Sequence, residues 1–82
     1  MDVNTVLGLV GALADKGIPV SDIKAKLRLT STQEKVLGIV IKQNKPLMEI
    51  RDLAGAARES RSAVTKALEN ITKELRALLG RA

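Results

Sequence analysis

The chain of 82 residues contains no Phe, Tyr or Trp, so its hydrophobic core must be built from Ala, Val, Ile, Leu and Met alone. The hydrophobic fraction is 45%, which is ordinary for a globular chain and argues against wholesale disorder. This length suits one core, and we expect a single domain over residues 1–82. The lack of aromatic rings also argues against single-stranded nucleic-acid platforms, which stack bases on aromatic side chains.

Cysteine and histidine are absent as well. A disulfide framework, a thiol nucleophile, a zinc cluster and a Ser-His-Asp triad are therefore excluded. The acidic residues Glu49, Asp52, Glu69 and Glu74 are spaced as ordinary surface charges of helices, without a glycine-rich phosphate loop or an activated nucleophile beside them. We therefore predict that the protein is not an enzyme and uses no metal and no cofactor.

The charge balance points to a polyanionic partner. Lys and Arg number 14 against 9 Asp and Glu, giving a net charge of +5. In so short a chain this favours nucleic acid, although a merely soluble basic domain is the alternative. The N-terminus lacks the basic segment of a signal peptide, and the apolar runs are too short to span a membrane. We expect a cytoplasmic, nucleoid-associated protein without a membrane partner.

Apolar residues near the N-terminus recur at three- and four-residue spacing, which predicts an amphipathic helix. Its apolar face comprises Val3, Val6, Leu7, Val10, Leu13 and Ala14. Asp2 can cap this helix, and Gly17 can close it in a left-handed conformation. Gly8 and Gly11 each weaken the helix by about 1 kcal/mol relative to Ala, or mark a close approach of another backbone.

Helix signals continue to the C-terminus. Ser21 is predicted to cap a short second helix that carries Ile23 and Leu27. The third helix has two candidate capping boxes, Thr30 with Gln33 and Ser31 with Glu34. The apolar run 36–41 is interpreted as a buried part of this third helix, with a buried strand as the alternative because β-branched residues are dense there.

The third helix is expected to end at Asn44-Lys45-Pro46. A fourth helix is predicted from about Met48 to Ala57, and a fifth from Ser60 to about Leu79. In the fifth helix Val64, Leu68, Ile71, Leu75 and Leu78 form one continuous apolar stripe. The fold class is therefore all-α, a small bundle of about five helices.

Two sequence motifs lie within residues 29–71. The first, Leu29-Thr30-Ser31-Thr32-Gln33 with Val36-Leu37, is similar to the Leu-Thr-x-x-Gln-x-x-Val-Leu opening of many winged-helix regulators. The segments 47–54 and 60–68 resemble the helix-turn-helix of the multiple-antibiotic-resistance (MarR) regulators and of LexA-like proteins. The resemblance implies a trihelical DNA-binding core over residues 29–71, with 1–28 and 72–82 as helical extensions. It also implies a transcriptional regulator whose helix beginning at Ser60 enters the major groove.

By this resemblance, the residues just after Ser60 contact DNA: Arg61, Ser62, Thr65 and Lys66. At about 100° per residue we expect these residues and Glu69 to lie opposite the apolar stripe. Flanking phosphate contacts are predicted for Lys45, Arg51 and Arg58. For each residue, a solvated surface charge is the alternative. Lys73 and Arg76 lie late on the helix, where they either face solvent or contact the backbone weakly.

The sequence departs from the family pattern at three places. Arg58 and Glu59 occupy turn positions that usually carry Gly and an apolar residue. A non-Gly residue in a left-handed conformation costs about 1 kcal/mol, whereas Glu59 favourably faces the positive end of the next helix. No wing follows, because residues 72–79 continue the helix. We therefore expect a wingless helical variant.

The apolar stripe extends beyond what a trihelical core needs. Leu75, Leu78 and Leu79 can pack on the N-terminal helix within one chain or across a two-fold axis, and we favour a homodimer that reads paired half-sites. A weaker helix-turn-helix lies thirty positions upstream, but its reading helix is too apolar and has Glu34 in place of Val64. The alternative function is a non-catalytic accessory subunit that binds another protein in a replication or nucleoprotein complex.

Overall fold

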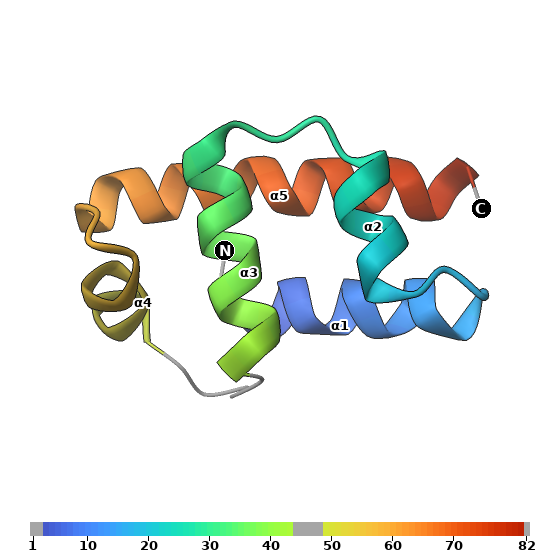
Figure 1. The fold of residues 1–82 in the computed structure, drawn as a ribbon, viewed down its shortest axis with the longest axis horizontal. Helices are drawn as coiled ribbons and strands as arrows, with labels where there is room; N and C mark the ends of the chain where they lie inside the picture. Colours follow the sequence, from blue (N-terminus) through green and yellow to red (C-terminus); the bar gives the residue numbers. More distant parts are fainter. Residues whose placement is uncertain (1–2, 44–48, 82) are drawn as a thin grey trace.

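The structure, a computed structural model, describes residues 3–43 and 49–81. Within these residues the chain forms five helices and no strand, so the all-α prediction is confirmed. The helices are α1 (Val3–Asp15), α2 (Val20–Lys26), α3 (Ser31–Gln43), α4 (Ile50–Ala57) and α5 (Arg61–Arg81). In Figure 1, α1 and α5 run side by side in the same direction, and α2 and α3 run across them.

The end of α1 has the geometry that its sequence predicts. Gly17 has a φ of 86°, which is a left-handed conformation. The N–H of Ile18 donates to the carbonyl of Leu13 at 3.0 Å, and the N–H of Gly17 donates to the carbonyl of Ala14 at 2.9 Å. This pair of bonds is a Schellman motif, which satisfies carbonyls that the helix end leaves without a partner. Asp2, the predicted cap at the other end, lies outside the described residues.

The predicted start of α2 is wrong by two positions. The helix begins at Val20, and Ser21 lies inside its first turn instead of capping it. Pro19 is the N-cap residue, with an extended backbone and no side-chain cap. Its carbonyl accepts the N–H groups of Asp22 and Ile23, each at 3.0 Å. The fixed φ of proline suits it to this boundary, and that constraint outweighs the capping preference of serine.

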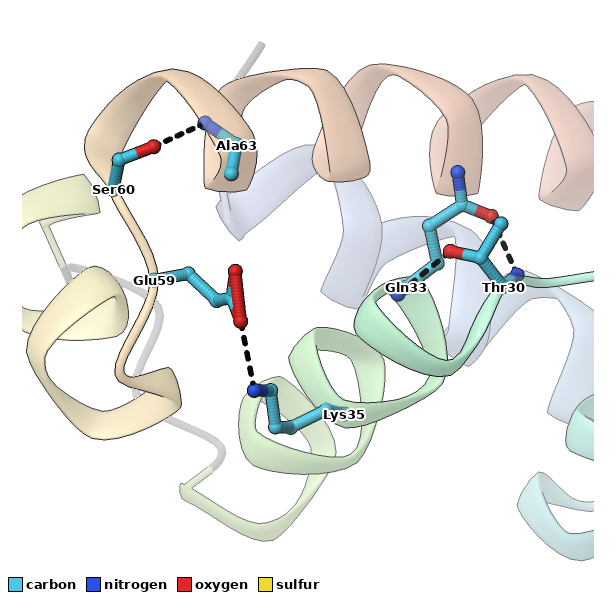
Figure 2. Close-up of polar contacts among 6 residues, drawn as sticks. All are labelled: Thr30, Gln33, Lys35, Glu59, Ser60 and Ala63. Atoms are coloured by element: carbon cyan, nitrogen blue, oxygen red, sulfur yellow. Dashed lines mark hydrogen bonds and ion pairs between the residues drawn. The ribbon is translucent and has the colours of Figure 1, made fainter.

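The start of α3 is held by a capping box. The N–H of Gln33 donates to Thr30 Oγ1 at 3.2 Å, and the N–H of Thr30 donates to Gln33 Oε1 at 3.0 Å (Figure 2). Of the two boxes that the sequence offers, Thr30 with Gln33 is therefore the one that forms. The run 36–41 is helical, so the strand alternative is wrong. Val36, Leu37 and Val40 are buried, whereas Ile39 and Ile41 are only half-buried.

The core is aliphatic and joins the first and last helices. Val3, Val6, Val10 and Leu13 of α1 are buried together with the stripe of α5, which consists of Val64, Ala67, Leu68, Ile71, Leu75 and Leu78. The helices α1 and α5 contact each other, and α3 contacts both. The long apolar stripe is therefore covered within one chain. Because this packing satisfies both apolar faces, the stripe no longer argues for a homodimer.

Gly8 and Gly11 do not mark a close approach of another backbone. Both are exposed, and a Cβ built on either would meet nothing within 4 Å. They lie on the outward face of α1, where each costs helix stability without a packing benefit. Among the helices of residues 3–43 and 49–81, none combines the length and apolar character that crossing a bilayer requires.

Candidate nucleic-acid interface

Three helices, α3, α4 and α5, are each in contact with the other two. The last two are joined by a short turn, Arg58-Glu59-Ser60, which carries one of the predicted contact residues. The fourth helix begins at Ile50, and Met48, where the sequence predicts its start, lies outside the described residues. Within the described residues, most of the sequence-predicted contact residues therefore lie in this turn and in the first turns of α5.

The turn is set by Arg58, which adopts a left-handed backbone with φ 57° and ψ 43°. Its N–H donates to the carbonyl of Gly55 at 3.3 Å, and the N–H of Glu59 donates to the carbonyl of Ala54 at 3.0 Å. These bonds repeat the motif that ends α1, with arginine where α1 has Gly17. Arg58, which the resemblance places where glycine is usual, therefore adopts the left-handed conformation, with the strain that this implies for a residue with a Cβ.

Ser60 starts α5 as the sequence predicts. Its Oγ accepts the N–H of Ala63 at 3.1 Å, and its carbonyl accepts the N–H of Val64 at 3.0 Å. Figure 2 shows Ser60 at the tip of α5, directly after Glu59. This cap fixes the direction in which α5 leaves the turn, and so fixes where its exposed side chains point.

Lys35 is a structural residue that the sequence reasoning missed. Its Nζ lies 2.9 Å from Glu59 Oε2, an ion pair that ties α3 to the turn before α5 (Figure 2). The two side chains are 45% and 28% exposed, so the pair contributes at most about 1 kcal/mol. The partners are far apart in sequence and belong to no shared motif, so no local signal could have found them.

The predicted reading residues fall on two different rows of α5. Arg61, Ser62 and Lys66 are exposed, whereas Thr65 is half-buried. Arg61 and Thr65 share a helical row with Leu68 and Thr72, both of which are buried. The expectation that all of them lie opposite the apolar stripe is therefore wrong for these two. Arg61 is exposed while its row is buried further along, because it is the first residue of the helix.

Ser62 and Lys66 do lie on the outward row of α5, together with Glu69 and Lys73. All four side chains are exposed, and none takes part in an ion pair within the described residues. This row carries hydroxyl and ammonium groups, which donate hydrogen bonds to phosphate oxygens and base edges. Of the four residues on α5 that are predicted to contact DNA, Ser62 and Lys66 are the two that lie on this exposed polar row.

The flanking cations differ in their surroundings. Arg58 is exposed at the turn. Arg51 is exposed in the first turn of α4, where its Nη2 lies 3.2 Å from Glu49 Oε2. With side chains 70% and 65% exposed, that pair leaves the Arg51 guanidinium accessible. Lys45, the third predicted phosphate contact, lies outside the described residues.

The upstream candidate, with α3 as the reading helix, is less accessible. The outward row of α3 comprises Ser31, Lys35, Gly38 and Lys42. Lys24 of α2 places its Nζ 3.4 Å from the position that a Cβ of Gly38 would take, so it covers the middle of this row. Lys35 is already engaged with Glu59. Elsewhere α3 packs on α1, α4 and α5, just as α5 packs on α1, α3 and α4, so the two helices differ mainly in the side chains that approach their outward rows.

Buried polar chemistry is scarce in this fold. Thr72 is the buried polar residue among those described, and its hydroxyl donates to the carbonyl of Leu68 at 2.7 Å. No group of three or more Asp or Glu that could hold a metal occurs within residues 3–43 and 49–81.

Comparisons with family models, curated proteins and solved structures find no match for this chain. The winged-helix resemblance therefore stays a prediction from the quoted motifs.

Proposed function

We propose that this protein binds double-stranded DNA in a sequence-specific manner and acts as a transcriptional regulator. The first turns of α5 enter the major groove, and α4 supports them from the side, as in a helix-turn-helix. The observation that carries the proposal is the outward row of α5, in which Ser62 and Lys66 are exposed directly after the Ser60 cap. The protein's net charge of +5 supplies the attraction to the phosphate backbone.

The turn supports the same proposal. Arg58 and Arg61 are exposed on either side of Ser60, so the tip of α5 presents two guanidinium groups. Glu59, the acid between them, has its charge balanced by Lys35. A neutralised carboxylate at this point lowers the repulsion that a phosphate would otherwise meet. The tip and the outward row together form a surface on which hydrogen-bond donors outnumber carboxylates.

The test is fluorescence anisotropy with a labelled duplex from upstream of the protein's own gene, compared with a scrambled duplex at two salt concentrations. Tight, selective binding that weakens steeply with salt supports a DNA-reading regulator. Equal binding to both duplexes contradicts sequence specificity and points to an architectural role. No binding by the well-folded protein contradicts the proposal as a whole.

Lys66→Ala gives a residue-level prediction. If the Lys66 ammonium contacts a base edge, the variant loses about 1–3 kcal/mol on the selected duplex and much less on the scrambled one. Lys16→Ala is the matched control, because Lys16 is also exposed and follows α1, which packs on the buried side of α5. Equal losses from the two variants on both duplexes would show that Lys66 contributes charge only, without reading a base.

A homodimer is part of the same proposal, since paired half-sites are commonly read by two-fold dimers. The best surface for such a contact is the outward face of α1, which contains no charged residue from Val3 to Ala14. The same uncharged face supports the second candidate function, an accessory subunit that binds another protein. Sedimentation velocity of the protein alone and with a duplex distinguishes a monomer from a symmetric pair.

A further inference from the structure

The length of α5 exceeds what a reading helix needs. It contains 21 residues, which corresponds to about 30 Å at 1.5 Å per residue. The proposed reading residues, Arg61 to Lys66, occupy less than two turns of it. The buried stripe accounts for the apolar inner face of the second half of α5, because Leu75 and Leu78 pack in the core. Packing does not explain the composition of the outer face.

The outward row stays uncovered from the first turn of α5 to the last. Its exposed members are Ser62, Lys66, Glu69, Lys73, Arg76, Ala77 and Gly80. Three of them are cations and one is an acid. Lys66, Lys73 and Arg76 take part in no ion pair within residues 3–43 and 49–81. A cationic strip with little internal neutralisation therefore runs along the whole helix, and the second half contributes two of its three charges.

The spacing of these cations suits a duplex. The major groove is about 12 Å wide and admits an α-helix, whereas the groove itself winds around the duplex axis. A straight helix of about 30 Å therefore leaves the groove and passes over the flanking backbone. Lys73 and Arg76 lie about 10 Å and about 15 Å beyond Lys66 along the helix axis. When Lys66 lies in the groove, these two cations lie where the helix crosses the phosphates.

We infer that the second half of α5 is a phosphate-contact surface, in which Lys73 and Arg76 bind the sugar-phosphate backbone beside the groove that the first turns occupy. The inference rests on the proposed function and deepens it, because it makes α5 dock lengthwise instead of by its tip alone. The partner class is duplex DNA, identified by charge complementarity and by the fit of a bare helix face to the groove.

The test measures the salt dependence of binding to a random-sequence duplex of about 20 base pairs, because phosphate contacts are independent of sequence. The variant is K73Q/R76Q, which removes two charges and keeps good helix formers. The matched control is K16Q/K42Q, which also removes two positive charges. Both residues are exposed: Lys16 directly follows α1, and Lys42 lies in α3. Both of these helices pack on the buried side of α5. Circular dichroism melts of each variant verify the fold.

The slope of log affinity against log salt is expected to fall by about 1.8 for K73Q/R76Q, since each phosphate contact contributes about 0.9. The ratio of the wild-type affinity to the affinity of this variant is then expected to fall about twelvefold between about 50 mM and about 200 mM salt. The control is expected to keep the wild-type slope. Equal slopes for the two double variants, or an unchanged slope for K73Q/R76Q, overturn the inference while leaving the proposed function intact. A wild-type protein that binds no duplex overturns the proposed function itself.

Discussion

Replacing Arg58 by glycine tests whether the turn before α5 carries backbone strain. Arg58 is the one non-glycine residue with a positive φ among those described, at 57°. A side chain in this left-handed region costs about 1–2 kcal/mol, because the Cβ approaches the following carbonyl. Glycine has no Cβ and adopts the conformation freely, as Gly17 does at the end of α1. Arg58→Gly is therefore expected to relieve this cost.

Two opposing effects reduce the gain. Glycine gives the unfolded chain more freedom, which lowers stability by about 0.4–1 kcal/mol. Removing the guanidinium also removes a charge that is favourable at the C-terminal end of α4, which is worth about 0.3–1 kcal/mol at an exposed site. Arg58→Ala loses the same charge without relieving the strain. The stability difference between the glycine and alanine variants therefore isolates the backbone effect, and we expect about 0.5–1 kcal/mol in favour of glycine.

The assay is urea unfolding followed by circular dichroism, with thermal melts as a second measurement. For a domain of this size, a difference of 1 kcal/mol corresponds to about 4–8 °C in Tm. The expected order places Arg58→Gly above Arg58→Ala, with equal m-values for the two. If Arg58→Ala is as stable as Arg58→Gly, the left-handed residue stores no strain and the reasoning about this turn is refuted. Both variants lose the same positive charge, so we expect their DNA affinities to be equal to each other.

Two further stability predictions use the same measurements. Gly11→Ala is expected to stabilise the protein by up to about 1 kcal/mol, because its Cβ would meet nothing within 4 Å in an exposed helix interior; a loss of stability would mean that this face of α1 is covered in solution. Ser60→Ala is expected to cost about 1 kcal/mol by removing the oxygen that accepts the Ala63 N–H, and Ser60→Asp, which restores an acceptor, is expected to recover most of the loss. An unchanged stability of Ser60→Ala would show that the cap contributes nothing to α5.

Local signals in the sequence were sufficient to predict most helix boundaries. Ser60, Thr30 and Gly17 each act through hydrogen bonds to residues within five positions, so the local sequence contains all the information that these caps require. The start of α2 was misplaced because Pro19 and Ser21 both suit a helix start, and the competition between them is decided by backbone geometry.

Long-range features of the structure could not be predicted in this way. The ion pair between Lys35 and Glu59 forms because α3 packs on α4 and α5, and no pattern in the sequence links its two partners. The covering of the long apolar stripe by α1 was one of two alternatives that the sequence left open. Periodicity identifies an apolar face, but it does not identify which element covers that face.

The choice of reading helix also depends on both local sequence and tertiary structure. The two candidate helix-turn-helix units predicted from the sequence begin thirty residues apart, since α2 and α4 start at Val20 and Ile50, and α3 and α5 start at Ser31 and Arg61. Local signals already favour α5 as the reading helix, because its upstream counterpart α3 is more apolar and has Glu34 where α5 has Val64. The tertiary structure adds a second difference. The Lys24 side chain approaches Gly38 in the middle of the outward row of α3, and Lys35 of that row pairs with Glu59, whereas no ion pair involves the outward row of α5 within the described residues. The outward row of α5 is exposed along its whole length, so mutation of that row is the strongest test of the proposed function.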